Sequence, residues 1–270
     1  MYQALYRKWR PQTFADVIGQ QHITDTLRAQ LQSGRLSHAY LFTGTRGTGK
    51  TTCVKILARA VNCEHPVNGD PCNECAACRG ILDGSVLDVT EIDAASNNGV
   101  DNIRDLRDET RYTPAQVRKR VFIIDEVHML SIGAFNALLK TLEEPPEHVL
   151  FILATTELHK VPATILSRCQ RFDFRRIGAE DISRRLLDVA AGEGIALTEG
   201  AARLIARLAD GAMRDALSML DRAAAAGAVD EKTVTAALGV MGQDDGIRLA
   251  EHLKTGDLAA AVGLLDEYYN

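Results

Sequence analysis

A glycine-rich segment at residues 44–52, with the sequence GTRGTGKTT, fits the template G-x-x-x-x-G-K-[ST] at every fixed position. Glycines let the backbone bend closely around phosphate groups and turn its N–H groups toward them. In such a loop Lys50 would contact the β- and γ-phosphates, and the Thr51 hydroxyl would coordinate Mg²⁺. The segment therefore predicts a nucleoside-triphosphate site. Its predicted binding residues are Gly44, Thr45, Arg46, Gly47, Thr48, Gly49, Lys50, Thr51 and Thr52.

Two carboxylates, Asp125 and Glu126, directly follow the apolar run 121–124. A strand of a parallel sheet is buried on both faces, so charges are tolerated only where it emerges at its carboxyl end. There Asp125 would act on Mg²⁺, directly or through water, and Glu126 would orient the attacking water. The alternative is that the two acids cap the next element. Thr155, which follows the apolar run 149–154, is a candidate contact to the γ-phosphate or the water.

Four of the six cysteines fall within residues 63–78 at the spacing of metal ligands. Four thiolates suit tetrahedral Zn²⁺ in a closed, structural site, and the metal would order a loop that has no strong core signal. His65 is a competing ligand, and a redox dithiol is a second alternative. Cys53 and Cys169 are expected to be reduced, buried thiols. The predicted zinc ligands are Cys63, Cys72, Cys75 and Cys78.

Strands alternating with helices are needed to position these groups, which indicates an α/β fold with a parallel sheet. Apolar runs predict strands at 39–42, 87–92, 121–125, 149–154 and 171–174. Periodic segments predict helices near 21–33, 50–61, 100–111 and 133–142. From residue 178 apolar residues recur only at helical spacing, which predicts a separate small helical domain after a linker near 176–178. One arginine of that domain, Arg214, begins a predicted helix.

The segment before the phosphate loop is irregular but apolar. We expect Val17 and Ile18 to fold over the adenine base while Arg10 and Pro11 fix this arm. The alternative is a solvent-exposed N-terminal arm.

Composition limits the class of protein. With 270 residues, of which 46% are hydrophobic, the chain can bury a core and is expected to form about two domains. The net charge of −5 argues against binding nucleic acid through bulk positive charge. No run approaches the roughly 18 apolar residues of a membrane helix, and no signal peptide is apparent at the N-terminus, so we expect a cytoplasmic protein with no membrane partner.

The order of these motifs resembles the AAA+ ATPases, specifically the clamp-loader branch and its gamma/tau subunits of bacterial DNA polymerase III. The resemblance spans about residues 5–241 and includes the cysteine module. It implies a five-stranded parallel sheet in the order 5-1-4-3-2. The segments that carry it are EIDAAS at 91–96, DEVHML at 125–130, NALLKTLEEPPE at 136–147 and SRC at 167–169. The implied domains are an ATPase domain at 1–177 with a zinc module at 63–78, a helical lid at 178–242 and the start of a truncated collar domain at 243–270.

The resemblance also implies a role for single residues. Asp125 and Glu126 would be the hydrolytic pair, Thr155 would be sensor one, and Arg214 would be sensor two, acting on the nucleotide of its own subunit. Arg168 would act in trans on ATP in a neighbouring subunit, where such a guanidinium is worth roughly 10³ to 10⁵ in rate. One isolated chain should therefore hydrolyse ATP poorly.

The implied function is ATP-driven loading of a sliding clamp onto primer-template DNA during replication. The implied partners are the delta and delta prime subunits, further gamma/tau copies, the clamp and the DNA. Arg104, Lys140 and Thr156 are candidate contacts to DNA phosphates, although residues 97–99 carry no positive charge. A non-hydrolysing adaptor and a branch-migration helicase are the alternatives. No polymerase active site is visible, so a polymerase activity would belong to the holoenzyme.

Overall fold

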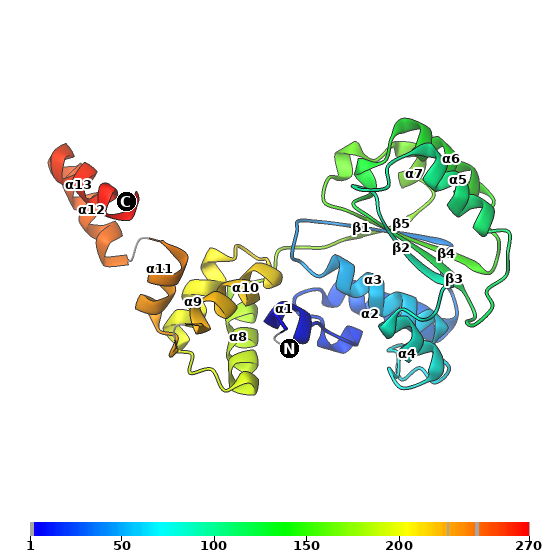
Figure 1. Cartoon of the computed structure of the whole chain (residues 1–270), viewed down its shortest axis with the longest axis horizontal. Coiled ribbons are helices and arrows are strands. Elements are labelled where there is room, and N and C mark those ends of the chain that lie inside the picture. Colours follow the sequence, from blue (N-terminus) through cyan, green and yellow to red (C-terminus); the bar gives the residue numbers. More distant parts are fainter. Residues whose placement is uncertain (1–2, 226, 241–242, 270) are drawn as a thin grey trace. The chain divides into compact units, whose positions relative to one another are not determined.

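The computed structural model describes residues 3–225, 227–240 and 243–269 (Figure 1). Contacts within the chain divide it into two compact units. One unit is Arg10–Ile177, and the other combines the residues up to Trp9 with those from Gly178 onward.

The first unit contains a five-stranded sheet in the order β2-β3-β4-β1-β5, which confirms the order implied by the resemblance. Every neighbouring pair of strands is parallel. The register pairs Thr43 with Thr155 and Ile124 with Leu153, so the carboxyl ends of β1, β3 and β4 lie at one edge. The strands are β1 (Ala39–Thr43), β2 (Val89–Asp93), β3 (Arg120–Asp125), β4 (Val149–Thr155) and β5 (Gln170–Asp173).

Helices cover both faces of this sheet, as Figure 1 shows. On one face α2 (Gln21–Ser33) and α3 (Lys50–Asn62) pack on Tyr40 and Phe42 of β1. Leu41 of the same strand faces the other core. This alternation buries both faces of the strand, as a parallel sheet requires. The other face is covered by α5 (Val100–Glu109), α6 (Ile132–Glu143) and α7 (Ala163–Leu166).

Short elements connect these layers. The 3₁₀ turns are η1 (Phe14–Asp16), η2 (Val127–Met129) and η3 (Leu158–Lys160), and α4 (Ala76–Asp83) belongs to the cysteine module. Helix α4 was not predicted from the sequence. The second strand begins at Val89 rather than at residue 87, because the Asp88 carboxylate is buried against Arg120 and two backbone N–H groups while Leu87 is exposed.

The second unit is helical, as expected from residue 178 onward. Its helices are α1 (Leu5–Lys8), α8 (Ala179–Glu193), α9 (Glu199–Leu208), α10 (Met213–Ala224), α11 (Glu231–Leu238), α12 (Gln243–Thr255) and α13 (Leu258–Tyr269). Within the residues described above, no helix combines the length and apolar character needed to cross a membrane.

Residues 3–9 pack with this helical unit, whereas the sequence analysis assigned them to the ATPase domain. Leu5 is buried, and its N–H donates to Asp221 Oδ2 at 3.3 Å. The Trp9 indole N–H donates to Glu193 Oε1 at 2.6 Å. A Cβ on Gly192 would lie 2.5 Å from the Trp9 ring, so only glycine permits this approach. Tertiary packing therefore determines the boundary at this end.

Candidate functional site: the nucleotide edge and the cysteine module

The phosphate loop joins β1 to α3, and its glycines have a positive φ. Gly44 has a φ of +145°, and a Cβ there would lie 2.5 Å from the Phe174 carbonyl oxygen. Gly49 has a φ of +105° and directly precedes α3. Both conformations are unfavourable for residues with a side chain. The loop consequently presents the N-terminus of α3, which favours anions.

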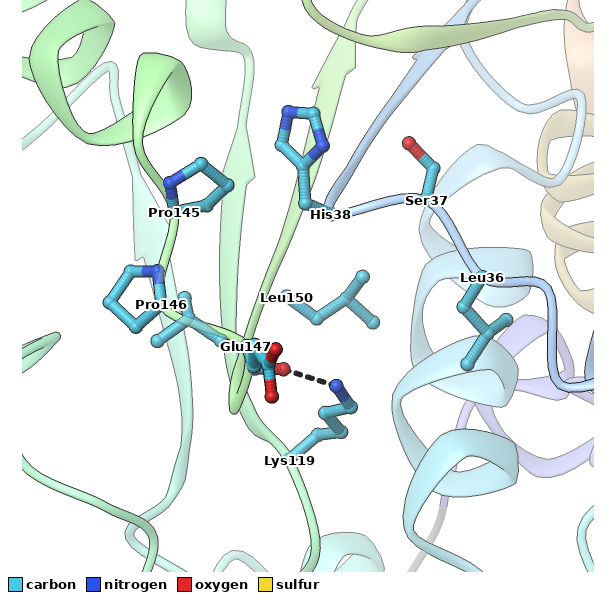
Figure 2. Close-up of a pocket in the computed structure, with 9 residues that line it drawn as sticks. Leu36, Ser37, His38, Lys119, Pro145, Pro146, Glu147 and Leu150 are labelled. Carbon is cyan, nitrogen blue, oxygen red and sulfur yellow. Dashed lines mark hydrogen bonds between the residues drawn. The ribbon is translucent and has the colours of Figure 1, made fainter.

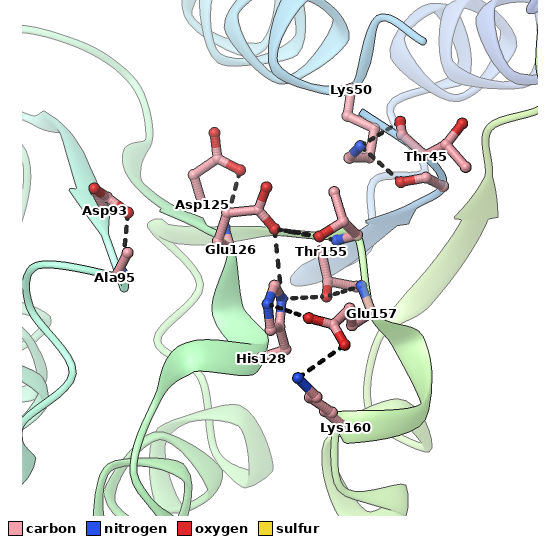
Figure 3. Close-up of polar contacts among 12 residues, drawn as sticks. Thr45, Lys50, Asp93, Ala95, Asp125, Glu126, His128, Thr155, Glu157 and Lys160 are labelled. Carbon is pink, nitrogen blue, oxygen red and sulfur yellow. Dashed lines mark hydrogen bonds and ion pairs between the residues drawn. The ribbon is translucent and has the colours of Figure 1, made fainter. Parts of the chain in front are cut away.

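Lys50, the first residue of α3, is 6% exposed. Its ammonium donates to the carbonyl oxygens of Gly44 and Thr45, each at 2.8 Å (Figure 3). Burial lowers the pKa of Lys50, and the nearby Glu126 and Asp125 carboxylates oppose that shift. The Lys50 ammonium therefore lies inside the loop, at the place where a phosphate group would bind.

Asp125 ends β3 beside this loop. Its Oδ2 accepts a hydrogen bond from the Thr51 hydroxyl at 3.2 Å. Burial raises the pKa of Asp125, while the Glu126 N–H, which donates to its Oδ1 at 2.9 Å, opposes the shift. A hydroxyl and a carboxylate are hard oxygen ligands of the kind that Mg²⁺ prefers. These two side chains thus fit a magnesium site.

Glu126 has a left-handed backbone, with a φ of +48°, which is uncommon for a residue other than glycine. Its Oε2 accepts from the Thr156 N–H at 3.2 Å and from the Thr156 hydroxyl at 2.9 Å. Sequence reasoning named Thr156 only as a DNA contact and missed its bond to Glu126. Thr155, the sensor-one candidate, is fully buried and instead bonds to His128 and to the Glu157 N–H.

His128 links Glu126 to the next loop, and sequence reasoning also missed this residue. Its Nδ1 lies 3.0 Å from the Thr155 hydroxyl and 3.4 Å from Glu126 Oε2. Its Nε2 lies 3.2 Å from Glu157 Oε1, and Lys160 pairs with the same carboxyl group at 2.8 Å (Figure 3). The sequence carried one signal for this role, namely a histidine two residues after a strand-end carboxylate.

The other predicted nucleotide residues lie in different parts of the chain. Val17 is buried after η1, and Arg10, Pro11 and Ile18 are half buried in the same arm. Arg214, in α10 of the helical unit, places its guanidinium 4.9 Å from the centre of the Tyr6 ring.

Arg168 is bonded within the sheet unit. It donates to Glu143 Oε1 at 2.7 Å and to the Thr164 carbonyl oxygen at 2.8 Å. Among the DNA candidates, Arg104 is exposed and pairs with Asp101 at 2.9 Å, and Lys140 is exposed on α6. These exposed cations are accessible to a partner.

The four cysteine thiols of the cysteine module, residues 63–78, lie within 4.8 Å of one another. A tetrahedral zinc site with Zn–S bonds of about 2.3 Å has sulfur atoms about 3.8 Å apart, so this set fits Zn²⁺. The Glu74 N–H lowers the pKa of Cys72 to about 6, whereas burial raises the pKa of Cys63 and Cys78. His65 is exposed and is not part of this cluster.

The two remaining cysteines are free thiols. Cys53 is buried, as expected, but Cys169 is only partly buried. Burial raises the pKa of each to about 12, so both remain protonated and unreactive at neutral pH.

A hollow of about 440 Å³ lies at the opposite edge of the sheet, beside the amino ends of β1, β3 and β4. Ser37, His38 and Leu150 are among its lining residues, and Lys119 donates to the Glu147 carbonyl oxygen at its rim (Figure 2). Open α/β sheets bind ligands at the carboxyl ends of their strands. The hollow is thus distinct from the nucleotide edge.

The fold and the nucleotide edge define an AAA+ ATPase architecture. Among solved structures, the chain superposes on "Thermotoga maritima RuvB Holliday junction branch migration motor" with a TM-score of 0.65. The superposition covers 94% of this chain and 85% of that one at 16% identity. At that identity the likeness supports the shared fold alone.

The sequence comparisons define the family. Residues 19–178 match the family described as "DNA polymerase III, delta subunit", and residues 181–229 match "DNA polymerase III clamp loader subunit, ATPase lid domain". The chain is 64% identical over 222 residues to the DNA polymerase III subunit tau of Bacillus subtilis strain 168, covering 82% of this chain and 39% of that relative.

The DNA polymerase III subunit gamma of Buchnera aphidicola subsp. Acyrthosiphon pisum, strain APS, is 44% identical over 268 residues, covering 98% of this chain and 74% of the relative. The chain belongs to the gamma/tau family of DNA polymerase III clamp-loader subunits. It spans about two fifths of the length of the tau subunits from Bacillus subtilis and Escherichia coli.

Proposed function

We propose that this chain is an ATP-driven motor subunit of a clamp loader, which binds and hydrolyses ATP to place a sliding clamp on primed DNA during replication. One observation carries the proposal: the Thr51 hydroxyl of the phosphate loop lies 3.2 Å from the Asp125 carboxylate at the end of β3. A glycine-rich loop and an acidic strand end that meet in this way are the two halves of a phosphoryl-transfer site.

Each half has a defined task in hydrolysis. Lys50, now bonded to the loop carbonyls, would turn its ammonium to the β- and γ-phosphates, and the loop N–H groups would bind their oxygens. Thr51 and Asp125 would hold Mg²⁺, which neutralises charge on the phosphate oxygens when it is bound. Glu126 would orient the attacking water, and Thr155 would sense the γ-phosphate.

Two arginines would complete the site. Arg214 would contact the nucleotide of its own subunit. Arg168 would reach ATP in a neighbouring subunit, after exchanging its bond to Glu143 for the phosphate. Hydrolysis would then depend on correct assembly, because the Arg168 guanidinium stabilises the transition state only when the neighbouring subunit is in place.

The proposal also includes an adenine-binding arm and a zinc site in the cysteine module. Val17 and Ile18 would cover the adenine, with Arg10 and Pro11 fixing the arm. Cys63, Cys72, Cys75 and Cys78 would hold one structural Zn²⁺. The domain limits expected from the sequence, a lid at 178–242 and a collar segment from 243, remain part of this interpretation.

The proposed partners follow from the family. They are the delta and delta prime subunits, further gamma/tau copies, the sliding clamp and primer-template DNA, in the cytoplasm. Arg104, Lys140 and Thr156 are the proposed DNA contacts, although the bond from Thr156 to Glu126 gives that residue a second role. Polymerase activity would reside elsewhere in the holoenzyme.

The competing interpretations have less support. A non-hydrolysing adaptor has no need for Lys50, Thr51, Asp125 and Glu126 in this arrangement. A branch-migration motor shares the fold, but its 16% identity contrasts with 64% to a tau subunit.

The ATP site is tested by two variants. Lys50→Ala should abolish ATP binding in equilibrium titrations, because it removes the cation that meets the phosphates. Arg168→Ala should leave binding unchanged and reduce hydrolysis only in mixed assemblies containing clamp, partner subunits and primed DNA. An equal loss of binding in both variants would contradict the assignment.

A further inference from the structure

The loop inside the cysteine module contacts the N-terminal arm that the proposed function places on the base. We define the module loop as residues 64–74 and the arm as residues 10–18. The Asn73 side-chain amide donates to the Gln12 carbonyl oxygen at 3.2 Å, and the Phe14 N–H donates to Asp70 Oδ1. Two backbone groups of the arm therefore depend on side chains of the module loop.

A buried arginine of α3 strengthens the same junction. Arg59 is 3% exposed, and its Nε donates to Asn73 Oδ1 at 3.1 Å. Its guanidinium also donates to the Gln12 carbonyl oxygen at 2.9 Å. Asn73 thus stands between the arm and a buried cation. Losing it would leave the buried Arg59 Nε–H without its partner, and an unpaired buried donor is costly.

The arm in turn leads directly to the proposed base-covering residues. Phe14 is 1% exposed and anchors the arm in the core. The Thr13 hydroxyl donates to Asp16 Oδ2 at 2.7 Å, which closes η1 just before Val17. A shift at Gln12 or Phe14 would therefore be passed along a rigid turn to Val17.

The module loop has little apolar packing of its own to hold it in place. Residues 64–68 are exposed, and a single bridge joins Val67 to Asp70. Gly69 lies against α2, where a Cβ would come within 2.7 Å of the Arg28 carbonyl oxygen. Arg28 also pairs with Asp70 Oδ2 at 3.2 Å. Because the loop has no apolar core of its own, its position depends on the contacts with Arg28 and on the four cysteines within and beside it.

We propose that metal binding by the four cysteines and nucleotide binding are coupled through Asn73 and Asp70, which hold the base-covering arm in place. The inference rests on the proposed function, because it takes the arm as the lid over adenine. Coupling between two sites is reciprocal. ATP should therefore raise the affinity for the metal by the same factor by which the metal raises the affinity for ATP.

The first experiment measures the ATP dissociation constant of the full chain by calorimetry with Mg²⁺ present. Asn73→Ala should weaken ATP binding about tenfold, within the range of roughly 5- to 150-fold typical of coupled sites. Asn68→Ala is the matched control, since Asn68 lies in the same loop with a similar φ of +52°, against +60° for Asn73, but its side chain is exposed. It should bind ATP as the wild type does.

A second variant, Asp70→Ala, tests the other contact, with the Phe14 N–H. It should also weaken ATP binding. Zinc content is measured for every protein, and each should retain one zinc per chain, which separates loss of the contact from loss of the metal. If Asn73→Ala and Asp70→Ala both hold zinc and bind ATP as tightly as the wild type, the coupling is refuted.

The reciprocal measurement follows zinc release to the chromophoric chelator 4-(2-pyridylazo)resorcinol. At equilibrium with the chelator, ATP should raise the zinc affinity of the wild type about tenfold, as the reciprocity of coupling requires, and should have little effect on that of Asn73→Ala. A zinc affinity that is insensitive to ATP in a wild type that binds ATP would overturn the inference. Failure of the wild type to bind ATP at all would instead overturn the proposed function.

Discussion

The nucleotide edge and the cysteine module hold their functional groups in different ways. At the nucleotide edge, the groups stand at the ends of buried strands and at the start of α3, and they are already bonded to one another, as in the contact between Thr51 and Asp125. In the module, the C-terminal end of α3, a largely exposed loop and the eight-residue helix α4 carry the ligands. The edge is therefore preorganised by the sheet, whereas the order of the module would depend on the zinc ion proposed for it.

The titrating groups show the same contrast. Burial lowers the pKa of Lys50 and raises that of Asp125, and the two groups oppose each other's shift. In the module, burial raises the pKa of Cys63 and Cys78, and Arg59 is a buried cation that interacts with Cys78. One guanidinium cannot stabilise several thiolates, whereas a metal bound by all four sulfur atoms would, and its binding would release protons.

The largest predicted effect is therefore loss of the metal. Cys78→Ser should release zinc, and since such sites contribute on the order of 10 kcal/mol to folding, residues 63–83 should lose their order. Hydrogen exchange followed by mass spectrometry should show fast exchange in α4, while β1, β3 and β4 stay protected.

The matched control is Cys169→Ser, a thiol outside the module, which should keep one zinc per chain. Protection of α4 that persists in zinc-free Cys78→Ser would remove the proposed difference between the two regions.

The next effect concerns the scaffold of the nucleotide edge. Asp88, just before β2, pairs with Arg120 at 2.9 Å and accepts the N–H groups of Ala115 and Gln116. Asp88→Ala would leave a poorly solvated guanidinium without its partner, at a cost of about 3 to 5 kcal/mol in the free energy of unfolding. Urea denaturation should measure this loss, and the exposed Asp105 of α5, changed to Ala, should stay within about 0.5 kcal/mol of wild type.

The effect of Asp88 should depend on pH. Burial alone would raise the pKa of Asp88, but Arg120 and the two N–H groups hold it below its usual value. Its contribution to stability is then complete above the unfolded pKa of about 3.9 and is lost as the pH falls through the lower folded pKa. The difference in stability between wild type and Asp88→Ala should therefore shrink below about pH 4. A constant difference from pH 6 to pH 3 would contradict this account.

The contrast between the regions also explains what sequence could predict. Short contiguous patterns beside apolar strands predicted the phosphate loop, Asp125 and Glu126. Such patterns suffice there because residues that are close in the sequence are also close in space. The bond from Thr156 to Glu126 depends on a left-handed backbone at Glu126. Because glutamate rarely adopts this conformation, its presence in the sequence could not predict the bond. Residues 3–9 joined the helical unit through packing of Trp9 with Gly192, which no local pattern shows.

A smaller effect is predicted for Glu126 itself, within the proposed function. Glu126→Gln should keep ATP binding, because Lys50 and Thr51 are untouched, and should lower kcat of the assembled loader about 10²- to 10⁴-fold, as for a group that handles a proton. Single-turnover hydrolysis measures this step. A loss of ATP affinity without a fall in kcat would assign Glu126 to binding instead.

The smallest effect sharpens the idea that the nucleotide edge is preorganised. His128 bonds to Thr155 and lies 3.4 Å from Glu126, so it would position the carboxylate to which the proposed function assigns the attacking water. Its loss removes about one hydrogen bond, which contributes about 1 kcal/mol. An increase of about 1.4 kcal/mol in the activation free energy corresponds to a tenfold fall in kcat. His128→Ala should lower kcat of the assembled loader by about that factor with KM for ATP unchanged, and His128→Asn should recover part of the rate.

His159 supplies the matched control for this prediction. It lies 3.7 Å from the same Glu157 carboxyl group that His128 contacts, but its side chain is 74% exposed. If the geometry around Glu126 determines the rate, His159→Ala should leave kcat unchanged. An equal fall in both variants would mean that the charge of the loop, rather than the position of one carboxylate, limits hydrolysis, and the preorganisation of this edge would then have no catalytic consequence.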